Sequence, residues 1–299
     1  KLTVSLAGFD ECSAIIPNLD LLLEEVEPYF PRFEVIVVSD GSTDTTNSQL
    51  ISFRHPDLKP IIVEKNTGKG NAVRAGFQHA TGDYILFIDG GMEIHPREIR
   101  IFVGLMSLYE CDIVIGSKRH PQSKVDYPIH RRMLSWLFQL MIRKLFKIDV
   151  TDTQVGIKLF RREVIDAVLP YLEIKRYGFD LEILTIAKMK GFNQILEAPI
   201  RLDYFSKNQR GAPSELLHVF KVGYSLLKDT LALYRRMNKV RELIKLEKKN
   251  SATERASQKS DVRRGLMQAL SFTLKNSHII FHFKNKNWRL LTPHSTDMI

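Results

Sequence analysis

The sequence has 299 residues, 44% of them hydrophobic and 26% charged, with only two cysteines, and this composition excludes a disordered, fibrous or disulfide-rich chain. The formal net charge of +10 points at first to a nucleic-acid partner. Residues 221–299, however, hold 17 Lys plus Arg against 6 Asp plus Glu, whereas residues 1–220 hold 27 against 28, so the positive charge belongs to the C-terminal tail and no nucleic-acid partner is predicted.

Five short runs rich in β-branched residues alternate with helical patterns in the first part of the chain. They are residues 2–6, 33–39, 60–64, 84–89 and 112–117. Strands that alternate with helices form βαβ units. The sequence therefore predicts an α/β domain over residues 1–215, with a mostly parallel sheet and helices on both faces. In such a sheet, ligands bind beyond the carboxyl ends of the strands.

Polar residues follow four of these strands, where such a ligand site is expected. Asp40 can accept hydrogen bonds from a base or a ribose while Gly41 lets the backbone approach, although the same stretch also fits a turn that caps a helix. Lys69, between two glycines, can open the next helix toward a phosphate group. The spacing matches neither a Walker loop nor a dinucleotide fingerprint, which argues against a P-loop enzyme or a nicotinamide oxidoreductase.

Two further groups of charged residues follow strands. Asp89 and Glu93 are carboxylates on one short loop, and they either hold a divalent cation that neutralises a pyrophosphate or lie in solvent. Lys118, Arg131 and their basic neighbours surround the apolar stretch 133–142. That pattern fits a lipid with a phosphate headgroup, or the solvated edges of an ordinary surface helix.

The tail begins with a periodic pattern. Over residues 216–249, apolar residues recur at helical spacing with basic residues between them, which predicts a basic amphipathic helix or helix pair. Such a helix binds an anionic membrane surface or packs on its own domain, and both interpretations stay open. Over residues 250–299 the sequence predicts a polar linker, at 250–262, and then a small element of unknown role.

Cysteine usage and hydropathy bear on the location of the protein. Cys12 and Cys111 are far apart and no Cys or His stands at zinc-ligand spacing, so we expect neither a zinc site nor a disulfide, in a reducing compartment. The sequence also has no run of the roughly 20 apolar residues that a spanning helix needs, and no basic start with an apolar core. We therefore expect a cytoplasmic protein without a transmembrane helix or signal peptide.

Six motifs taken together resemble those of a known family. They are SDGSTDTT at 39–46, EKNTGKGNAVRAGF at 64–77, ATGDYILFIDGG at 80–91, VIGSK at 114–118, TDTQVGIKLFRREV at 151–164 and RYGFDLEIL at 176–184. In this order, over residues 1–215, the chain resembles the inverting GT-A glycosyltransferases that make polyprenyl-phosphate sugars, such as dolichyl-phosphate mannose and glucose synthases. The last two motifs are most similar to the glucosyl branch.

The resemblance implies a Rossmann-like GT-A fold and a metal-dependent inverting hexosyltransferase that uses Mg²⁺ or Mn²⁺. Its donor would be a nucleotide sugar, UDP-glucose in preference to GDP-mannose, and its acceptor a polyprenyl (dolichyl) phosphate. Such an enzyme would lie peripherally on the cytoplasmic face of a membrane, where a membrane-protein partner or a homo-oligomer would fit.

The resemblance also implies roles for individual residues. On the donor side, Glu11 and Asp40 would hold the nucleoside, Lys69 would approach the nucleotide diphosphate, and Asp89 with Gly90 would begin the metal motif. The remaining assignments are Lys118, Arg131 and Ser135 for the acceptor phosphate, Asp152, Gln154, Asp180 and Glu182 for the sugar pocket, and Lys207 or Arg210 for the sugar diphosphate.

Two departures from the family pattern matter. The stretch SLAGFDEC replaces a proline-containing turn after the first strand, which bears on the role of Glu11. Gly91 stands where the metal motif has its second acidic residue, and Glu93 is the residue that could supply the missing charge. Without that charge, metal binding would be weak.

Two alternatives to the lipid-phosphate acceptor stay open. One is a glycosyltransferase with a glycan or soluble acceptor, for which Asp152 or Asp180 would serve as the base. The basic residues between 118 and 143 argue against it. The other is a catalytically degenerate protein that binds a sugar nucleotide, and it is suggested by Gly91.

Overall fold

The computed structural model of the chain describes residues 1–125, 129–202, 212–276, 280–284 and 287–291. Side chains are described for residues 1–125, 136, 138–202, 223–250, 253–254 and 257–268. The chain divides into two compact units, Lys1–Val240 and Arg241–Ile299.

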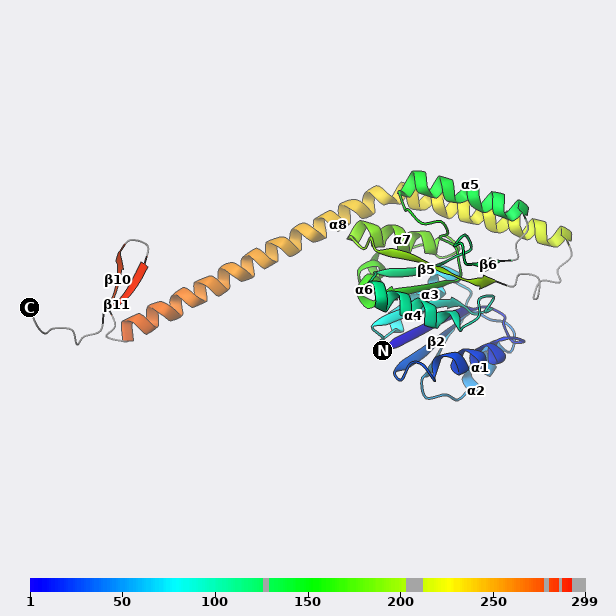
Figure 1. Cartoon of the computed structure of the whole chain (residues 1–299), viewed down its shortest axis with the longest axis horizontal. Helices are drawn as coiled ribbons and strands as arrows, with labels where there is room; N and C mark the ends of the chain where they lie inside the picture. The colour runs from blue at the N-terminus through cyan, green and yellow to red at the C-terminus, as the bar shows by residue number, and fades with distance from the viewer. Residues whose placement is uncertain (126–128, 203–211, 277–279, 285–286, 292–299) are drawn as a thin grey trace, which may run out of the picture. The chain divides into compact units, whose positions relative to one another are not determined.

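A seven-stranded sheet forms the centre of the first unit, with helices on both of its sides (Figure 1). Its strands, in the spatial order β3-β2-β1-β4-β7-β5-β8, are β1 (Leu2–Gly8), β2 (Phe33–Asp40), β3 (Leu58–Val63), β4 (Tyr84–Asp89), β5 (Ile113–Ser117), β7 (Ile157–Arg161) and β8 (Ile195–Pro199). Neighbouring strands are parallel except at β7, which is antiparallel to both β4 and β5. The predicted class, a mixed and mostly parallel α/β sheet, is confirmed.

Two helical layers cover the sheet. Helices α1 (Ile15–Val26), α2 (Thr46–Ser52) and α4 (Glu98–Tyr109) share one hydrophobic core with Leu86 and Ile88 of β4. The other β4 face carries Phe87, whose ring meets that of Phe179 at 5.6 Å between centroids. That face is covered by α3 (Lys69–His79), α6 (Arg162–Val168), the 3₁₀ turn η1 (Leu169–Tyr171) and α7 (Phe179–Lys190). Alternating side chains of β4 thus pack against the helices on both faces of the sheet, as expected for a central strand.

Helix α5 (Ile129–Phe146) lies alongside the first part of α8 (Ala212–Asn276), as Figure 1 shows. The rings of Phe146 and Tyr234 pack edge to face, with centroids 6.2 Å apart. Leu233, Met237 and Val240 of α8 are buried, so this stretch of the basic helix packs on its own domain. Two short strands, β6 (Lys124–Val125) and β9 (Arg201–Leu202), pair in parallel as a separate two-stranded sheet.

The predicted linker at residues 250–262 is wrong, because these residues continue α8 as a single helix. The stretch contains no glycine or proline and is rich in Ala, Glu, Arg, Gln and Lys, which favour a helix. Every described side chain from 253 to 268 is exposed, so the polarity reflects a solvated helix. Beyond it, in the second unit, β10 (Ile280–Lys284) and β11 (Asn287–Leu291) form an antiparallel hairpin. Within the described ranges, no helix is both long and apolar enough to cross a bilayer.

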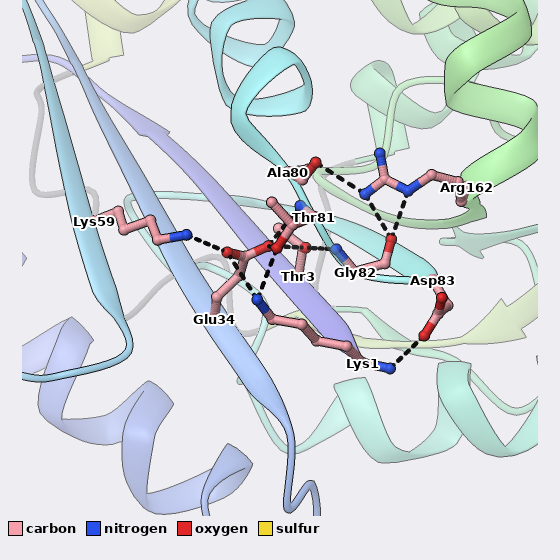
Figure 2. Close-up of polar contacts among 9 residues, drawn as sticks. All are labelled: Lys1, Thr3, Glu34, Lys59, Ala80, Thr81, Gly82, Asp83 and Arg162. Carbon is pink, nitrogen blue, oxygen red and sulfur yellow. Dashed lines mark hydrogen bonds and ion pairs between the residues drawn. The ribbon is translucent and has the colours of Figure 1, made fainter.

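A buried carboxylate ties together the strands at the amino-terminal end of the sheet (Figure 2). Glu34 of β2 is 1% exposed. It accepts hydrogen bonds from the hydroxyls of Thr3 and Thr81, both at 2.7 Å, and from the ammonium of Lys59, also at 2.7 Å. Burial acts to raise the pKa of Glu34, but the hydrogen bonds from Lys59, Thr81 and Thr3 outweigh it and hold the pKa well below its ordinary value.

Arg162, the first residue of α6, strengthens the same corner of the sheet (Figure 2). Its guanidinium donates to the carbonyl oxygens of Ala80 at 2.9 Å and Gly82 at 2.8 Å. This joins the start of α6 to the turn between α3 and β4, next to the Thr81 that Glu34 binds. Glu34 and Arg162 therefore fix the register of β1, β2 and β4 at the edge opposite to the carboxyl ends.

We expect Glu34→Gln to lower the free energy of unfolding by about 2 kcal/mol at neutral pH, because charge-assisted hydrogen bonds are lost in a buried site. Since the pKa is lower in the folded state than its ordinary 4.5, this contribution is fully present above that pH and declines as the pH falls below it. Urea unfolding of both proteins between pH 7 and pH 3.5 measures the difference. The exposed Glu24→Gln is the matched control, and a difference that does not shrink with falling pH would contradict the assignment.

Candidate active site

The loops that follow β1, β2 and β4 meet at the carboxyl edge of the sheet. Gly8 of β1 pairs with Ser39 of β2, and Ala7 of β1 pairs with Asp89 of β4, so the three strands end at the same level. The polar edge predicted from the sequence is therefore present. At this edge lie Asp40 and Asp89, the last residues of β2 and β4, together with Glu11 in the loop after β1 and Lys69 at the start of α3.

Asp40 fastens the loop that precedes α3. Its carboxylate is 3% exposed and accepts hydrogen bonds from the backbone N–H of Thr67 and the backbone N–H of Gly68, both at 2.8 Å. Gly41 adopts φ +72°, and a Cβ there would lie 2.1 Å from the nitrogen of Asn66, so only glycine allows the two loops to pass this closely. Asp40 thus positions residues 67–68, which lead into Lys69. This contact is additional to its predicted role in holding a nucleoside.

Lys69 forms an ion pair with Asp89 at the mouth of the site. The ammonium lies 2.7 Å from Oδ1 of Asp89, and the two side chains are 32% and 36% exposed. The same ammonium lies 5.7 Å and 5.9 Å from the ring centroids of Phe87 and Phe179, within cation–π range. A cation and a carboxylate, each partly open to solvent, thus stand together where four strands end.

A second ion pair lies beneath the first. Lys158 of β7 and Asp180 of α7 are 2.5 Å apart, and their side chains are only 1% and 7% exposed. Asp180 also attracts Lys69 electrostatically. We call the four residues Lys158, Asp180, Lys69 and Asp89 the charge row, because positive and negative groups alternate from the interior to the surface.

The charge row controls the protonation of its members. Burial raises the pKa of Asp180, and the ammonium groups of Lys158 and Lys69 offset only part of that effect. For Lys69, burial acts to lower the pKa, but the carboxylates of Asp89 and Asp180 outweigh it and the pKa is raised above its ordinary value. Lys69 is therefore a cation throughout the neutral pH range.

The backbone around Asp89 is closely packed. We call residues Asp152, Thr153 and Gln154 the DTQ turn. A Cβ at Gly156, between this turn and β7, would lie 2.2 Å from Oδ2 of Asp89, so the glycine leaves room for this carboxylate. The neighbouring Gly90 donates its N–H to the carbonyl of Ala7 at 3.2 Å and accepts a bond from the side-chain amide of Asn18 at 2.8 Å. Asp89 consequently projects from a fixed backbone.

The position of the missing acidic residue faces another carboxylate. A Cβ at Gly91 would lie 3.7 Å from Oε1 of Glu11, which reaches it from the loop after β1. Glu93 is exposed. Among the residues that the structure describes, no group of three or more His, Cys, Asp or Glu side chains is arranged to hold a metal ion by itself. A cation at this edge would need oxygen ligands from a substrate as well as from Asp89.

The DTQ turn forms a second polar wall. Asp152 is 5% exposed, lies 3.4 Å from the ammonium of Lys118 and accepts a bond from the backbone N–H of Gln154 at 3.1 Å. The hydroxyl of Thr153 and the side-chain nitrogen of Gln154 are buried and, within the described part of the chain, have no hydrogen-bond partner. Such unmatched donors are costly unless a ligand or water binds them.

Glu182 lies in a different environment from Asp180, although both are on α7. It is fully buried and accepts bonds from the backbone N–H of Ile174 at 2.9 Å and from the guanidinium of Arg236 on α8 at 2.6 Å. Burial raises the pKa of Glu182. Its partners belong to the loop after η1 and to α8, and not to the charge row, so its contacts are structural.

Several predicted residues lie outside the described set. Arg131 and Ser135 fall in the first turns of α5, where side chains are not described, and Lys207 and Arg210 fall in residues 203–211. Sequence reasoning missed Lys158, whose signal was a lone charge within the apolar strand IKLF. A charged side chain in a buried strand requires a partner of opposite charge.

The fold and several relatives of this chain are known. The model of the family described as Glycosyl transferase family 2 matches residues 8–169. A dolichyl-phosphate beta-glucosyltransferase of Trichomonas vaginalis is 33% identical, over 66% of this chain and 62% of its own length. A dolichyl-phosphate beta-glucosyltransferase of Saccharomyces cerevisiae is 30% identical, over 67% of this chain and 66% of its own length. The chain thus spans just under two thirds of these two relatives.

A further relative and a solved structure also match the chain. An undecaprenyl-phosphate mannosyltransferase of Micrococcus luteus is 29% identical over 62% of this chain and 78% of its own length. The crystal structure of glucosyl-3-phosphoglycerate synthase from Mycobacterium tuberculosis with Mn²⁺ and UDP-glucose superposes with a TM-score of 0.56. That match is 18% identical and covers 78% of each chain, and it shows a shared fold.

Proposed function

Since the chain belongs to glycosyl transferase family 2, we propose that it transfers a hexose from a nucleotide sugar to a polyprenyl phosphate, with inversion at the anomeric carbon. UDP-glucose is the favoured donor because the relatives from Trichomonas vaginalis and Saccharomyces cerevisiae are both named for glucosyl transfer. GDP-mannose is the other candidate because the relative from Micrococcus luteus is named for mannosyl transfer. The observation that carries the proposal is the partly exposed Lys69–Asp89 pair at the mouth of the site.

This ion pair suits a nucleotide diphosphate that binds together with a divalent ion. Without substrate, Lys69 and Asp89 neutralise each other. A diphosphate offers Lys69 a stronger anionic partner, which leaves the Asp89 carboxylate for a cation. Mg²⁺ or Mn²⁺ would be held by Asp89, with Glu11 or Glu93 as further oxygen donors, and would supply charge neutralisation of the leaving diphosphate. The hard oxygen donors present fit such an ion.

The acceptor chemistry follows from the state of the two candidate bases. Asp152 is paired with Lys118 and Asp180 with Lys158, and both carboxylates are buried. An alcohol acceptor would need a free carboxylate within reach of its proton. A phosphate monoester does not, because its second pKa is about 6 and it is ionised at neutral pH. This favours a phosphate acceptor over a glycan hydroxyl.

The proposed step is a single displacement. An acceptor phosphate oxygen attacks the anomeric carbon, the bond from that carbon to the diphosphate oxygen breaks, and the nucleoside diphosphate leaves with the electron pair. No proton need be moved. The protein contributes positioning and electrostatic stabilisation. We assign Lys118 to the acceptor phosphate, and the buried donors of Thr153 and Gln154, unpartnered within the described residues, to the sugar hydroxyls.

A lipid acceptor also requires access to a membrane, and the adjacent helices α5 and α8 offer an apolar surface. Trp136 and Leu140 of α5 are exposed, as are three α8 residues at helical spacing, Tyr224, Leu227 and Leu231. We call these five residues the apolar strip. Exposed Lys144 and Lys228 accompany it. Aromatic and aliphatic side chains flanked by lysines suit the interface of an anionic bilayer, so we place the enzyme peripherally on a cytoplasmic membrane face.

The reaction itself provides the first test. With Mg²⁺ or Mn²⁺ and polyprenyl phosphate in detergent, labelled hexose from UDP-glucose, or from GDP-mannose in a parallel assay, is expected to appear in the organic phase. Asp89→Asn is expected to lower kcat by about 100-fold or more with only a small decrease in Tm, because the Asp89 side chain is 36% exposed and the buried Lys158–Asp180 pair stays intact. The exposed Asp20→Asn on α1 serves as the matched control. Unchanged turnover by Asp89→Asn would remove Asp89 from the site, and failure of both donors would contradict the lipid-phosphate acceptor.

The apolar strip provides a second test. Replacing Tyr224, Leu227 and Leu231 together by Ser is expected to weaken binding to anionic vesicles by about tenfold or more, because each loses apolar area from the interface. Transfer to a long polyprenyl phosphate in vesicles should fall in parallel, while transfer to a short, soluble prenyl phosphate should not. Leu108→Ser on α4, equally a change at an exposed leucine, is the control. An equal loss with both acceptors would mean that these residues serve packing alone.

A further inference from the structure

Helix α8 contacts the loop of residues 173–178, and this loop packs against the turn that carries Lys69. We infer that Asp229 and Arg236 of α8 are positioning residues for the nucleotide diphosphate, acting through residues 173–178. The inference rests on the proposed function, because it assigns Lys69 to the diphosphate.

The first link is the guanidinium of Arg236, whose side chain is 17% exposed. It lies 2.6 Å from the Glu182 carboxylate and 3.4 Å from the Glu173 carboxylate, and it also donates to the carbonyl oxygen of Tyr171. Glu182 in turn accepts the backbone N–H groups of Glu173 and Ile174, at 3.1 Å and 2.9 Å. A fully buried carboxylate with these partners fixes both ends of the contact, because neither charge can be left unpaired in the interior.

The second link is Asp229, about two turns earlier on α8. Its carboxylate accepts the backbone N–H of Gly178 at 3.1 Å, immediately before α7 begins at Phe179. A Cβ at Gly178 would lie 2.6 Å from the Cβ of Asp229, so the backbone of this loop touches α8 directly. Arg236 and Asp229 thus hold residues 173–178 at their two ends.

Between these ends, the loop receives the turn that carries Lys69. The carbonyl oxygen of Lys175 accepts the N–H of Gly70 at 2.8 Å. Gly68 has φ +101°, and a Cβ there would lie 2.4 Å from the same Lys175 oxygen. A Cβ at Gly70 would lie 2.2 Å from the carbonyl oxygen of Ile174. Close backbone packing of this kind transmits a shift of one loop to the other, because no flexible side chain lies between them.

The Lys69 turn is therefore held from two sides. Asp40 of β2 binds it at Thr67 and Gly68, and residues 174–175 support it from the α8 side. Phe179, the first residue of α7, completes the support, since the ammonium of Lys69 lies over its ring. Removing the α8 contacts would loosen residues 173–178, and with them the support of the Lys69 turn on the side opposite Asp40.

The same helix also carries part of the apolar strip, at Tyr224, Leu227 and Leu231. One stretch of α8 thus bears both the contacts to the Lys69 support and the residues proposed to meet the membrane. Because ordering α8 and ordering the Lys69 turn involve the same contacts, the two are expected to be coupled.

Asp229→Ala is the principal test, because it removes one backbone contact without leaving a buried charge. Hydrogen exchange of the peptide over residues 66–72 is expected to speed up by about fivefold, the effect of one lost hydrogen bond on local opening, while a β1 peptide exchanges as before. Calorimetric titration with UDP and with GDP, each with Mn²⁺, should show a similar increase in Kd. The KM for the nucleotide sugar should rise by the same factor, with kcat and the KM of the acceptor unchanged.

Matched variants separate positioning from stability. Asp229→Asn keeps an oxygen that can accept the Gly178 N–H and should restore both exchange and Kd. Arg236→Gln should also speed the exchange of residues 66–72 and raise the nucleotide Kd, with a larger fall in Tm because the buried Glu182 carboxylate loses its cation. Lys239→Gln, at an exposed cation one turn further along α8, should act as wild type. If Asp229→Ala and Arg236→Gln lower Tm but leave the exchange of residues 66–72 and the nucleotide Kd at wild-type values, the inference is wrong. If the wild-type chain binds neither nucleotide, the proposed function fails and the nucleotide role of the two residues fails with it.

Discussion

The charge row is the constraint on which the arrangement of this domain depends. Lys158 is a charged residue in the middle of a buried strand, and its burial is tolerable only because Asp180 lies 2.5 Å away. That requirement fixes the start of α7 against β7. Asp180 then attracts Lys69, which opens α3, and Lys69 reaches Asp89 at the end of β4. Four elements that are distant in sequence are thus held in one register by alternating charges.

Function follows from the difference between the inner and outer halves of the charge row. The inner pair, Lys158 and Asp180, is buried and stays paired, whereas the side chains of the outer pair, Lys69 and Asp89, are about one third exposed. A bound diphosphate would pair with Lys69, and a bound divalent ion would pair with Asp89. Both residues can therefore change partners while the local charge stays balanced. Lys69 and Asp89 thus stay in contact until the substrate and its metal ion separate them.

Much of the fold could be predicted from the sequence, because local hydrophobic patterns mark several of its strands. The runs at 33–39 and 84–89 correspond closely to β2 and β4, and the polar residues behind them do share one edge. β7 and β8 were missed because each has only five residues and contains a charged residue, Lys158 or Glu197, whose burial depends on distant partners. For the same reason Glu182 was grouped with Asp180 on α7, although its partner Arg236 lies on α8. Polarity alone also misassigned residues 250–262, which have good helix propensity without an apolar face.

The measurement that tests this account most directly is the coupling between nucleotide and metal binding. Titration calorimetry of the wild-type chain with UDP, in the presence and absence of Mn²⁺, gives the affinity in each case, and the reverse titrations give the affinity for Mn²⁺. If the Lys69–Asp89 pair changes partners on binding, each ligand should tighten the other by the same factor, about tenfold or more. Equal UDP affinity with and without Mn²⁺, despite clear UDP binding, would contradict the exchange of partners and with it the central role given to the charge row.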